Sequence, residues 1–92
     1  MKENTRVDFE STDDPNVVIV HTNRELSEAI EICRSPEEAA NGSALAALLG
    51  SIDGIVGLEL NNRDMQLSRD PDIAWENIEL QVIEAVKDFY LL

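Results

Sequence analysis

Apolar and polar residues alternate in several short segments, and this pattern predicts strands over much of the chain. The alternation at 6–10 predicts an edge strand. The β-branched run at 17–20 is too short for a buried helix, so it predicts a strand covered on both faces. Apolar positions at 55–60 and 65–67 predict two more strands. The segment Asn61-Asn62-Arg63 favours a tight hairpin between them, because asparagine tolerates a positive φ.

Two short helices are expected in the middle of the chain. Ser35 is a good N-cap and Pro36 suits the first helical position, so a helix should begin there. Ser43 can cap a second short helix at 44–49. The spacing of its apolar residues predicts a buried side made of Leu45, Leu48, Leu49 and Ile52.

The clearest helix signal covers residues 73–90, with Asp72 as its expected N-cap. Apolar residues recur there every three or four positions, which places them along one side of a helix. An amphipathic helix of this kind has to cover a sheet or another helix. The predicted contact stripe consists of Trp75, Ile78, Val82, Val86 and Phe89.

Residues 26–34 allow two interpretations. The helical spacing i, i+3, i+4, i+7 joins four apolar residues, which are Leu26, Ala29, Ile30 and Cys33. In a strand, Ile30 and Ile32 would share one face, and Glu31 and Cys33 would share the other. Local rules slightly favour the helix, whereas the family resemblance described below favours the strand, and we follow the resemblance.

Length and charge narrow the possible functions. The chain has 92 residues, so we interpret residues 1–92 as a single domain. Its 19 Asp and Glu residues against seven Lys and Arg give a net charge of −12, which repels nucleic-acid phosphates and acidic membranes. No apolar segment approaches the roughly 20 residues of a membrane span. We therefore expect a cytoplasmic protein that binds a protein partner, with neither nucleic acid nor a membrane as its target.

Cys33 is the only cysteine and His21 the only histidine. One cysteine excludes an intrachain disulfide and a zinc site of four cysteines. If 17–21 and 28–33 formed a hairpin, His21 would lie near its turn and Cys33 near its far end, so no Cys–His pair is expected. The motifs of serine nucleophiles and phosphate-binding loops are absent from the sequence. We therefore expect that the protein is not an enzyme.

The candidates for metal ligation are Cys33, Glu84 and Asp88. Glu84 and Asp88 are separated by four positions, which places both on one side of the predicted terminal helix. Hard cations such as calcium take about six to eight oxygens, and no calcium-loop motif is present. Cysteines like Cys33 more often serve as small apolar residues, and carboxylate pairs more often lie on a solvated helix face.

Five short segments occur in a characteristic order along the chain. They are TDDPN at 12–16, SALA at 43–46, IDGI at 52–55, DMQLS at 64–68 and WENI at 75–78. Together they resemble the N-terminal domain of Nfu/NifU-type scaffold proteins, which carries T-P-N-P-N, a small-residue helix start, I-[DE]-G-V, D-F-I-T-V and W-[DE]-x-[LI] at these places. The likeness covers about residues 5–90. Gly50 departs from the family, which often has Phe there, and Leu58-Glu59 and Met65 replace aromatic positions, so the core should be more aliphatic.

The resemblance implies an α+β fold, in which a small antiparallel-rich β-sheet has two helices packed on one face. The expected order is β-β-β-α-β-β-α. It also implies an association with iron–sulfur cluster assembly, although the family's cluster-binding CxxC motif belongs to a separate C-terminal domain, which we expect this chain to lack.

These observations lead to two hypotheses for the function. The first is a non-catalytic accessory or adaptor domain, related to iron–sulfur scaffold proteins, that acts by docking a partner protein. No cofactor is expected in the isolated domain, and iron or an iron–sulfur cluster would be reached through the partner. The alternative is a carboxylate-based module that binds iron or another divalent cation, because acidic side chains are abundant.

Overall fold

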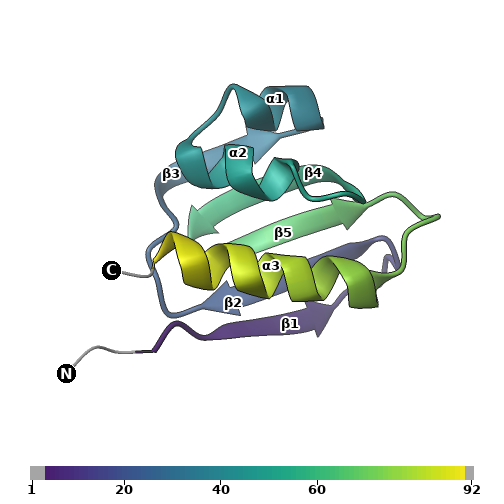
Figure 1. Cartoon of the computed structure of the whole chain (residues 1–92), viewed down its shortest axis with the longest axis horizontal. Helices are drawn as coiled ribbons and strands as arrows, with labels where there is room; N and C mark the ends of the chain where they lie inside the picture. The colour runs from purple at the N-terminus through teal and green to yellow at the C-terminus, as the bar shows by residue number, and fades with distance from the viewer. Residues whose placement is uncertain (1–3, 91–92) are drawn as a thin grey trace.

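A computed structural model describes residues 4–90 as a five-stranded antiparallel sheet with three helices on one face (Figure 1). This confirms the α+β class, and the two short helices expected from the cap signals occupy the place of the single helix in the order implied by the resemblance. The elements in chain order are β1 (Val7–Ser11), β2 (Val17–Thr22), β3 (Ser27–Cys33), α1 (Pro36–Ala40), α2 (Ala44–Gly50), β4 (Ile55–Asn62), β5 (Asp64–Arg69) and α3 (Trp75–Phe89).

The strands lie in the order β1-β2-β5-β4-β3, so β2 and β3 are consecutive in sequence but have two strands, β5 and β4, between them in the sheet. A hairpin between them, considered from the sequence, is therefore wrong. The chain instead crosses the end of the β4–β5 hairpin. The Thr22 amide donates to the Arg63 carbonyl at 2.9 Å, and the Leu26 amide donates to the Asn62 carbonyl at 2.6 Å. These bonds satisfy backbone groups of the β2–β3 connection and of the β4–β5 turn.

The β4–β5 hairpin is confirmed, and its turn explains why asparagine occurs there. Asn62 has a φ of 59°, a left-handed conformation that asparagine tolerates better than most residues. The register places Asn61 opposite Asp64 and Leu60 opposite Met65. Residues 26–34 contain the strand β3, as the resemblance implied, because Glu31, Ile32 and Cys33 pair with Leu60, Glu59 and Leu58 of β4.

The two short helices begin at their predicted caps. The Ser35 hydroxyl accepts from the Glu38 amide, and the Ser43 hydroxyl accepts from the Ala46 amide, both at 3.2 Å. The predicted N-cap of α3 is wrong. The N-cap is Ala74 rather than Asp72, and no side chain caps the helix.

Asp72 belongs to a separate turn that precedes α3. The Asp70 carboxylate accepts from the Asp72 amide, and the Asp70 carbonyl accepts from the Ile73 amide, both at 2.9 Å. This turn keeps residues 70–73 out of the helix, which begins at Trp75.

The core lies between the sheet and the helices, and every buried side chain among residues 4–90 is apolar. Ile78, Val82 and Val86 of α3 are fully buried, as the stripe predicted. Two other predictions of burial are wrong, because Leu48 and Phe89 are 38% and 40% exposed. The remaining buried residues are Val18, Val20, Leu26, Cys33, Ala39, Leu45, Ala46, Leu49, Ile52, Ile55, Leu58, Leu60, Met65 and Leu67.

Each end of α3 is tied to a loop by an aromatic side chain. At its start, the Trp75 indole donates to the Pro15 carbonyl at 2.8 Å, and the Arg69 guanidinium lies over the indole at 5.4 Å. At its end, the Tyr90 hydroxyl donates to the Glu25 carbonyl at 3.1 Å. Tyr90 thus takes the inward position at this end, and Phe89 packs edge-on against it at the surface.

Helices cover only one face of the sheet (Figure 1). In β2, Val18 and Val20 are buried, whereas Val17 and Ile19 are half-buried on the opposite face. The expectation that this strand is covered on both faces is therefore wrong, because the sheet has no second helical layer in the described part of the chain.

Candidate functional site

The uncovered side of the sheet, which we call the open face, carries an ordered array of polar and apolar side chains. Residues that pair across an antiparallel sheet point to the same side. The strand register therefore defines one row of Asp8, His21, Asp64 and Asn61, a second row of Glu10, Ile19, Gln66, Glu59 and Ile32, and a third row of Val17, Ser68 and Gly57.

One half of the open face contains an ionic cluster that joins three strands. The His21 ring lies between two carboxylates, with Nε2 2.6 Å from Glu10 Oε1 and Nδ1 2.9 Å from Asp64 Oδ1. The hydrogen bond with Glu10, followed by that with Asp64, raises the pKa of His21 above its ordinary value. The protonated ring donates from both nitrogens, so both are engaged and neither is available to a metal ion.

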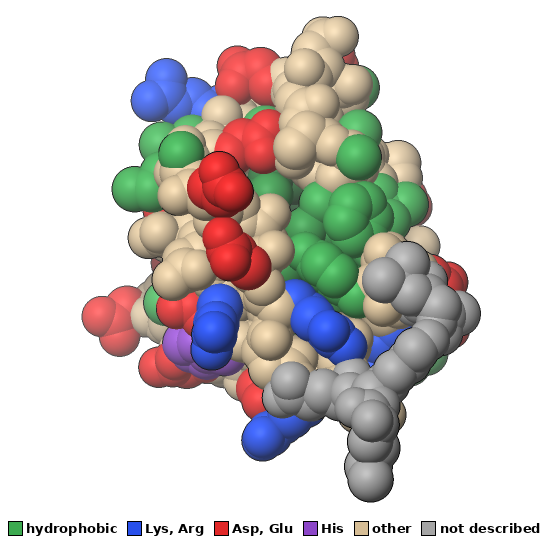
Figure 2. Space-filling view, turned by 90° about the vertical axis from the view of Figure 1, so that its left-hand side faces the viewer, with side chains coloured by type: hydrophobic (Ala, Val, Ile, Leu, Met, Phe, Trp, Pro, Cys, Tyr) green, Lys and Arg blue, Asp and Glu red, His purple; other side chains and the backbone are tan. Residues whose placement is uncertain are grey.

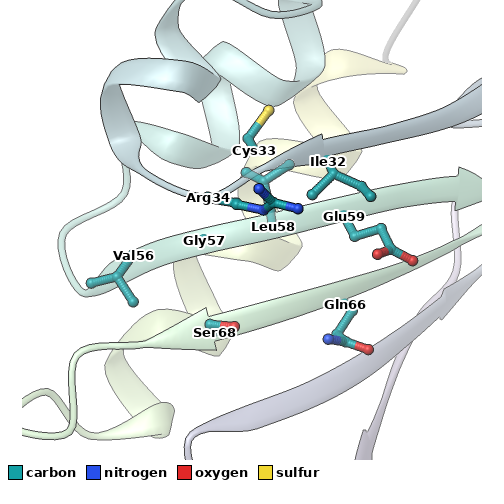
Figure 3. A pocket seen from close by; sticks show the side chains of 9 residues that line it. All are labelled: Ile32, Cys33, Arg34, Val56, Gly57, Leu58, Glu59, Gln66 and Ser68. Atoms are coloured by element: carbon teal, nitrogen blue, oxygen red, sulfur yellow. The ribbon is translucent and has the colours of Figure 1, made fainter.

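The other half of the open face contains a shallow depression of about 280 Å³ (Figure 3). Gly57 and Ser68 form part of its lining, and their small size leaves space above the sheet. Figure 3 shows Ile32 of β3 near the carboxylate of Glu59, whereas Val56 lies farther along β4, beyond Gly57. The complete lining is Ile32, Cys33, Arg34, Val56, Gly57, Leu58, Glu59, Gln66 and Ser68.

A smaller hollow of about 180 Å³ shares Glu59 and Gln66 with this depression and extends toward Ile19 and Asp64. The two hollows therefore form a continuous, uneven surface across the middle of the open face. Such a surface suits contact with another macromolecule better than enclosure of a small molecule, since ligand pockets bury most of their ligand.

Large apolar side chains are unusually exposed at the β3 edge. Ile30 and Ile32 of β3 are 59% and 52% exposed, and Val56 of β4 is 40% exposed. Figure 2, which views the end of the molecule where both termini lie, shows hydrophobic areas on two sides of a column of Asp and Glu side chains. Apolar and acidic groups are thus neighbours on this end of the molecule.

The structure separates Cys33 from the other two candidate metal ligands, Glu84 and Asp88. Cys33 is 4% exposed and belongs to the core, with its sulfur directed toward the helices in Figure 3. Desolvation, followed by the charges of Glu31 and Glu38, raises the pKa of its thiol and disfavours a thiolate. Glu84 and Asp88 are exposed on α3. Within residues 4–90, no group of three or more His, Cys, Asp or Glu side chains could hold a metal ion.

Sequence reasoning missed the open face as a site, although it assigned the relevant faces of β3 correctly. The alternation of Ile30 and Ile32 with Glu31 and Cys33 was visible in the sequence. The alternation alone did not show which of the two faces is buried. In the structure Cys33 is buried, and the two isoleucines face solvent. The sequence feature that could have revealed the site was therefore the pair Ile30 and Ile32, which lie on the face of β3 opposite to the buried Cys33.

Taken together, the five-stranded sheet with helices on one side and an amphipathic uncovered face defines a small α+β domain with a surface suited to macromolecular contact. The family described as "Scaffold protein Nfu/NifU N terminal" matches residues 7–91. The chain therefore belongs to the Nfu/NifU scaffold protein N-terminal family, which confirms the resemblance found in its sequence.

Two known proteins are similar to this chain. NifU-like protein 4, mitochondrial, from Arabidopsis thaliana is 25% identical over 84 residues. These cover 91% of this chain, which spans only 30% of that relative. The solution NMR structure of a NifU-like protein from Saccharomyces cerevisiae matches with a TM-score of 0.76 at 14% identity. The match covers 92% of this chain and 77% of the yeast chain, and at that identity it establishes the shared fold alone.

Within residues 4–90, no helix is both long and apolar enough to cross a bilayer.

Proposed function

We propose that this domain is a non-catalytic adaptor of iron–sulfur cluster assembly, and that it acts by docking a partner protein. The match to a scaffold family over residues 7–91 is the observation that supports it most. The uncovered sheet face, with apolar and acidic side chains side by side, supports docking rather than catalysis. The buried thiol of Cys33, whose pKa is raised, also fits a domain without a nucleophile.

The docking part of the proposal is tested by affinity capture. The tagged chain is incubated anaerobically with lysate of its source organism, and an unrelated acidic protein of similar size serves as the control. Proteins of iron–sulfur assembly should be enriched on the chain relative to the control. Equal recovery of these proteins on both baits would overturn the docking function.

We further propose that the isolated domain holds no cofactor of its own, and that iron or a cluster reaches it only through a partner. The purified chain is treated anaerobically with iron and sulfide, desalted, and analysed by absorbance and metal content. We expect no retained chromophore. A tightly retained cluster that disappears in both Cys33→Ser and Cys33→Ala would overturn this part and indicate a cluster bound through cysteines of two chains.

The alternative function is a carboxylate-based module for iron or another divalent cation. It is favoured by Glu84 and Asp88, which are exposed one helical turn apart on α3. Two carboxylates are few for a hard cation that prefers six or more oxygens. Calorimetry with Fe²⁺, Mn²⁺ and Ca²⁺ separates the two functions, since micromolar binding that is lost in Glu84→Gln/Asp88→Asn would favour the metal module.

A cytoplasmic location is the last part of the proposal, supported by the single unpaired cysteine, which suits a reducing compartment. The name of the Arabidopsis relative describes it as mitochondrial. Fractionation of the source cells tests the point, and recovery of the chain in an organelle fraction would contradict it.

A further inference from the structure

The β3–β4 side of the open face concentrates apolar surface that nothing in the described chain covers. Six large apolar residues are exposed among residues 4–90, and three of them belong to β3 and β4. These three are Ile30, Ile32 and Val56, and the last two line the 280 Å³ depression. Exposed apolar side chains grouped beside a hollow are typical of interaction sites, whereas scattered ones are ordinary.

Charge on the same surface indicates the chemistry of the partner. Glu59 lines both hollows, and its carboxylate has no hydrogen-bond or ion-pair partner within residues 4–90. Asp8, on the neighbouring row, is also exposed and without a side-chain partner in the described chain. Arg34 is the one basic residue that lines the depression. Because the whole chain also has a net charge of −12, this surface attracts cationic groups.

The same charges argue against a second copy of this chain as the occupant. Two molecules meeting through their open faces would bring Glu59 and Asp8 of each toward carboxylates of the other. Each molecule would also bring its net charge of −12. Like charges that face each other across an interface are costly, so a basic partner fits better than self-association.

We propose that the open face binds a basic segment of a partner protein, which places an apolar side chain in the depression between Ile32 and Val56 and a Lys or Arg at Glu59. This proposal rests on the docking function above and specifies its surface and its ligand chemistry. The apolar contact supplies affinity and the carboxylates supply orientation and rate of association.

Gly57 offers a way to fill the depression without disturbing the fold. A Cβ added at Gly57 would lie 3.4 Å from the Cys33 carbonyl and 3.8 Å from the Ser68 Cβ, which are ordinary contacts. Its backbone does not adopt a positive φ. Gly57→Ala should therefore fold normally while it raises the lining where the partner's side chain inserts.

The test uses a synthetic 12-residue peptide of alternating Lys and Leu, titrated into the ¹⁵N-labelled chain. Saturable NMR shifts should map to β3, β4 and β5. Ile32→Thr/Glu59→Gln should weaken binding about tenfold, the size expected for truncation of a central contact. Gly57→Ala should weaken it by a similar factor, because the added methyl group occupies the place of the inserted side chain. An alternating Glu–Leu peptide should not bind.

A matched variant on the helical side separates this site from general attraction to negative charge. Glu76→Gln/Leu80→Thr removes one carboxylate and one exposed apolar side chain from α3, where Leu80 is 61% exposed. It should leave peptide affinity unchanged. An equal loss in this variant, shifts that map to α2 and α3, or equal binding of the acidic peptide would overturn the proposal.

Two further measurements distinguish the failure of this surface from the failure of the docking function. If the wild type captures iron–sulfur assembly proteins and Ile32→Thr/Glu59→Gln captures them equally, the docking function stands and the surface is wrong. Concentration-dependent shifts of the open face in the absence of peptide, with dimers seen by sedimentation, would instead identify a second copy as the occupant and overturn the basic partner.

Discussion

The two faces of one sheet in this domain are built from the same strands and yet have opposite character. Toward the helices, residues such as Val20, Leu60 and Leu67 are fully buried, and no polar side chain is buried among residues 4–90. Away from the helices, the alternate positions carry His21 between two carboxylates and Glu59 without a partner in the described chain. The strand period of two thus separates the residues that stabilise the fold from those available for recognition.

This difference predicts that substitutions on the helical side cost far more stability than equivalent ones at the surface. Ile78→Ala should lower the free energy of unfolding by about 2–5 kcal/mol, because Ile78 is fully buried and the sheet beneath it cannot close the cavity. Leu80→Ala, two positions along the same helix, should cost less than about 1 kcal/mol, because Leu80 is 61% exposed. Urea denaturation of both variants checks the contrast, and equal losses would contradict the helix orientation.

Two glycines give the next largest contrast. Gly54 has a φ of 103°, and a Cβ there would approach Ile73 Cγ2 at 2.7 Å and Ile78 Cδ1 at 3.0 Å. Gly54→Ala should therefore cost about 1–3 kcal/mol, from backbone strain together with displacement of core side chains. Gly57→Ala on the open face meets only ordinary contacts and should cost nothing measurable. The midpoints of thermal unfolding test the pair, and a stable Gly54→Ala would show that the 51–54 turn relaxes easily.

Local signals predicted much of the fold because their causes lie within a few residues. The caps at Ser35 and Ser43 bind amides three positions along, and Asn62 serves a turn of its own hairpin. The start of α3 was misjudged because Asp70, rather than Asp72, organises the turn before it. Phe89 matched the helical spacing, yet the inward position at this end belongs to Tyr90, which bonds to the distant Glu25 carbonyl.

The candidate site was not predictable in the same way, since its parts come from distant segments. Ile32, Glu59 and Gln66 become neighbours only through the β3–β4 and β4–β5 registers. Which side of β3 is exposed depends on where α1 and α2 pack, and the sequence of β3 alone does not specify that. The polar alternation of the strands was visible, but the absence of a second helical layer was not, as the wrong expectation for β2 shows.

The cap of α2 gives a smaller effect on the helical side. Ser43→Ala removes the hydroxyl that accepts from the Ala46 amide at 3.2 Å, and it should cost about 1 kcal/mol. The Ser43 backbone amide keeps its bond to Glu31 Oε2 at 2.8 Å, so the start of the helix remains partly satisfied. Ser11→Ala, at the exposed end of β1, is the matched control and should be neutral. If both variants unfold alike in urea, the cap contributes nothing to stability.

The smallest effect belongs to the open face and depends on pH. Because Glu10 and Asp64 raise the pKa of His21 above its ordinary value of about 6.5, the folded protein binds this proton more tightly than the unfolded chain. The stabilisation is fully present below pH of about 6.5 and decreases as the pH rises through the raised pKa of the folded state. His21→Gln should remove this dependence while leaving the rest of the stability curve unchanged.

NMR titration of the His21 ring and unfolding of both proteins from about pH 5 to pH 9 measure this effect directly. The ring is solvent-exposed, so salt should screen its attraction to the two carboxylates and shift the pKa back toward its ordinary value. A His21 that titrates at or below that value in low salt would mean that the cluster does not persist in solution. The cluster joins β1, β2 and β5 on the uncovered side only. That result would therefore contradict the described arrangement of side chains on the open face, but not the packing of the buried side of the sheet against the helices.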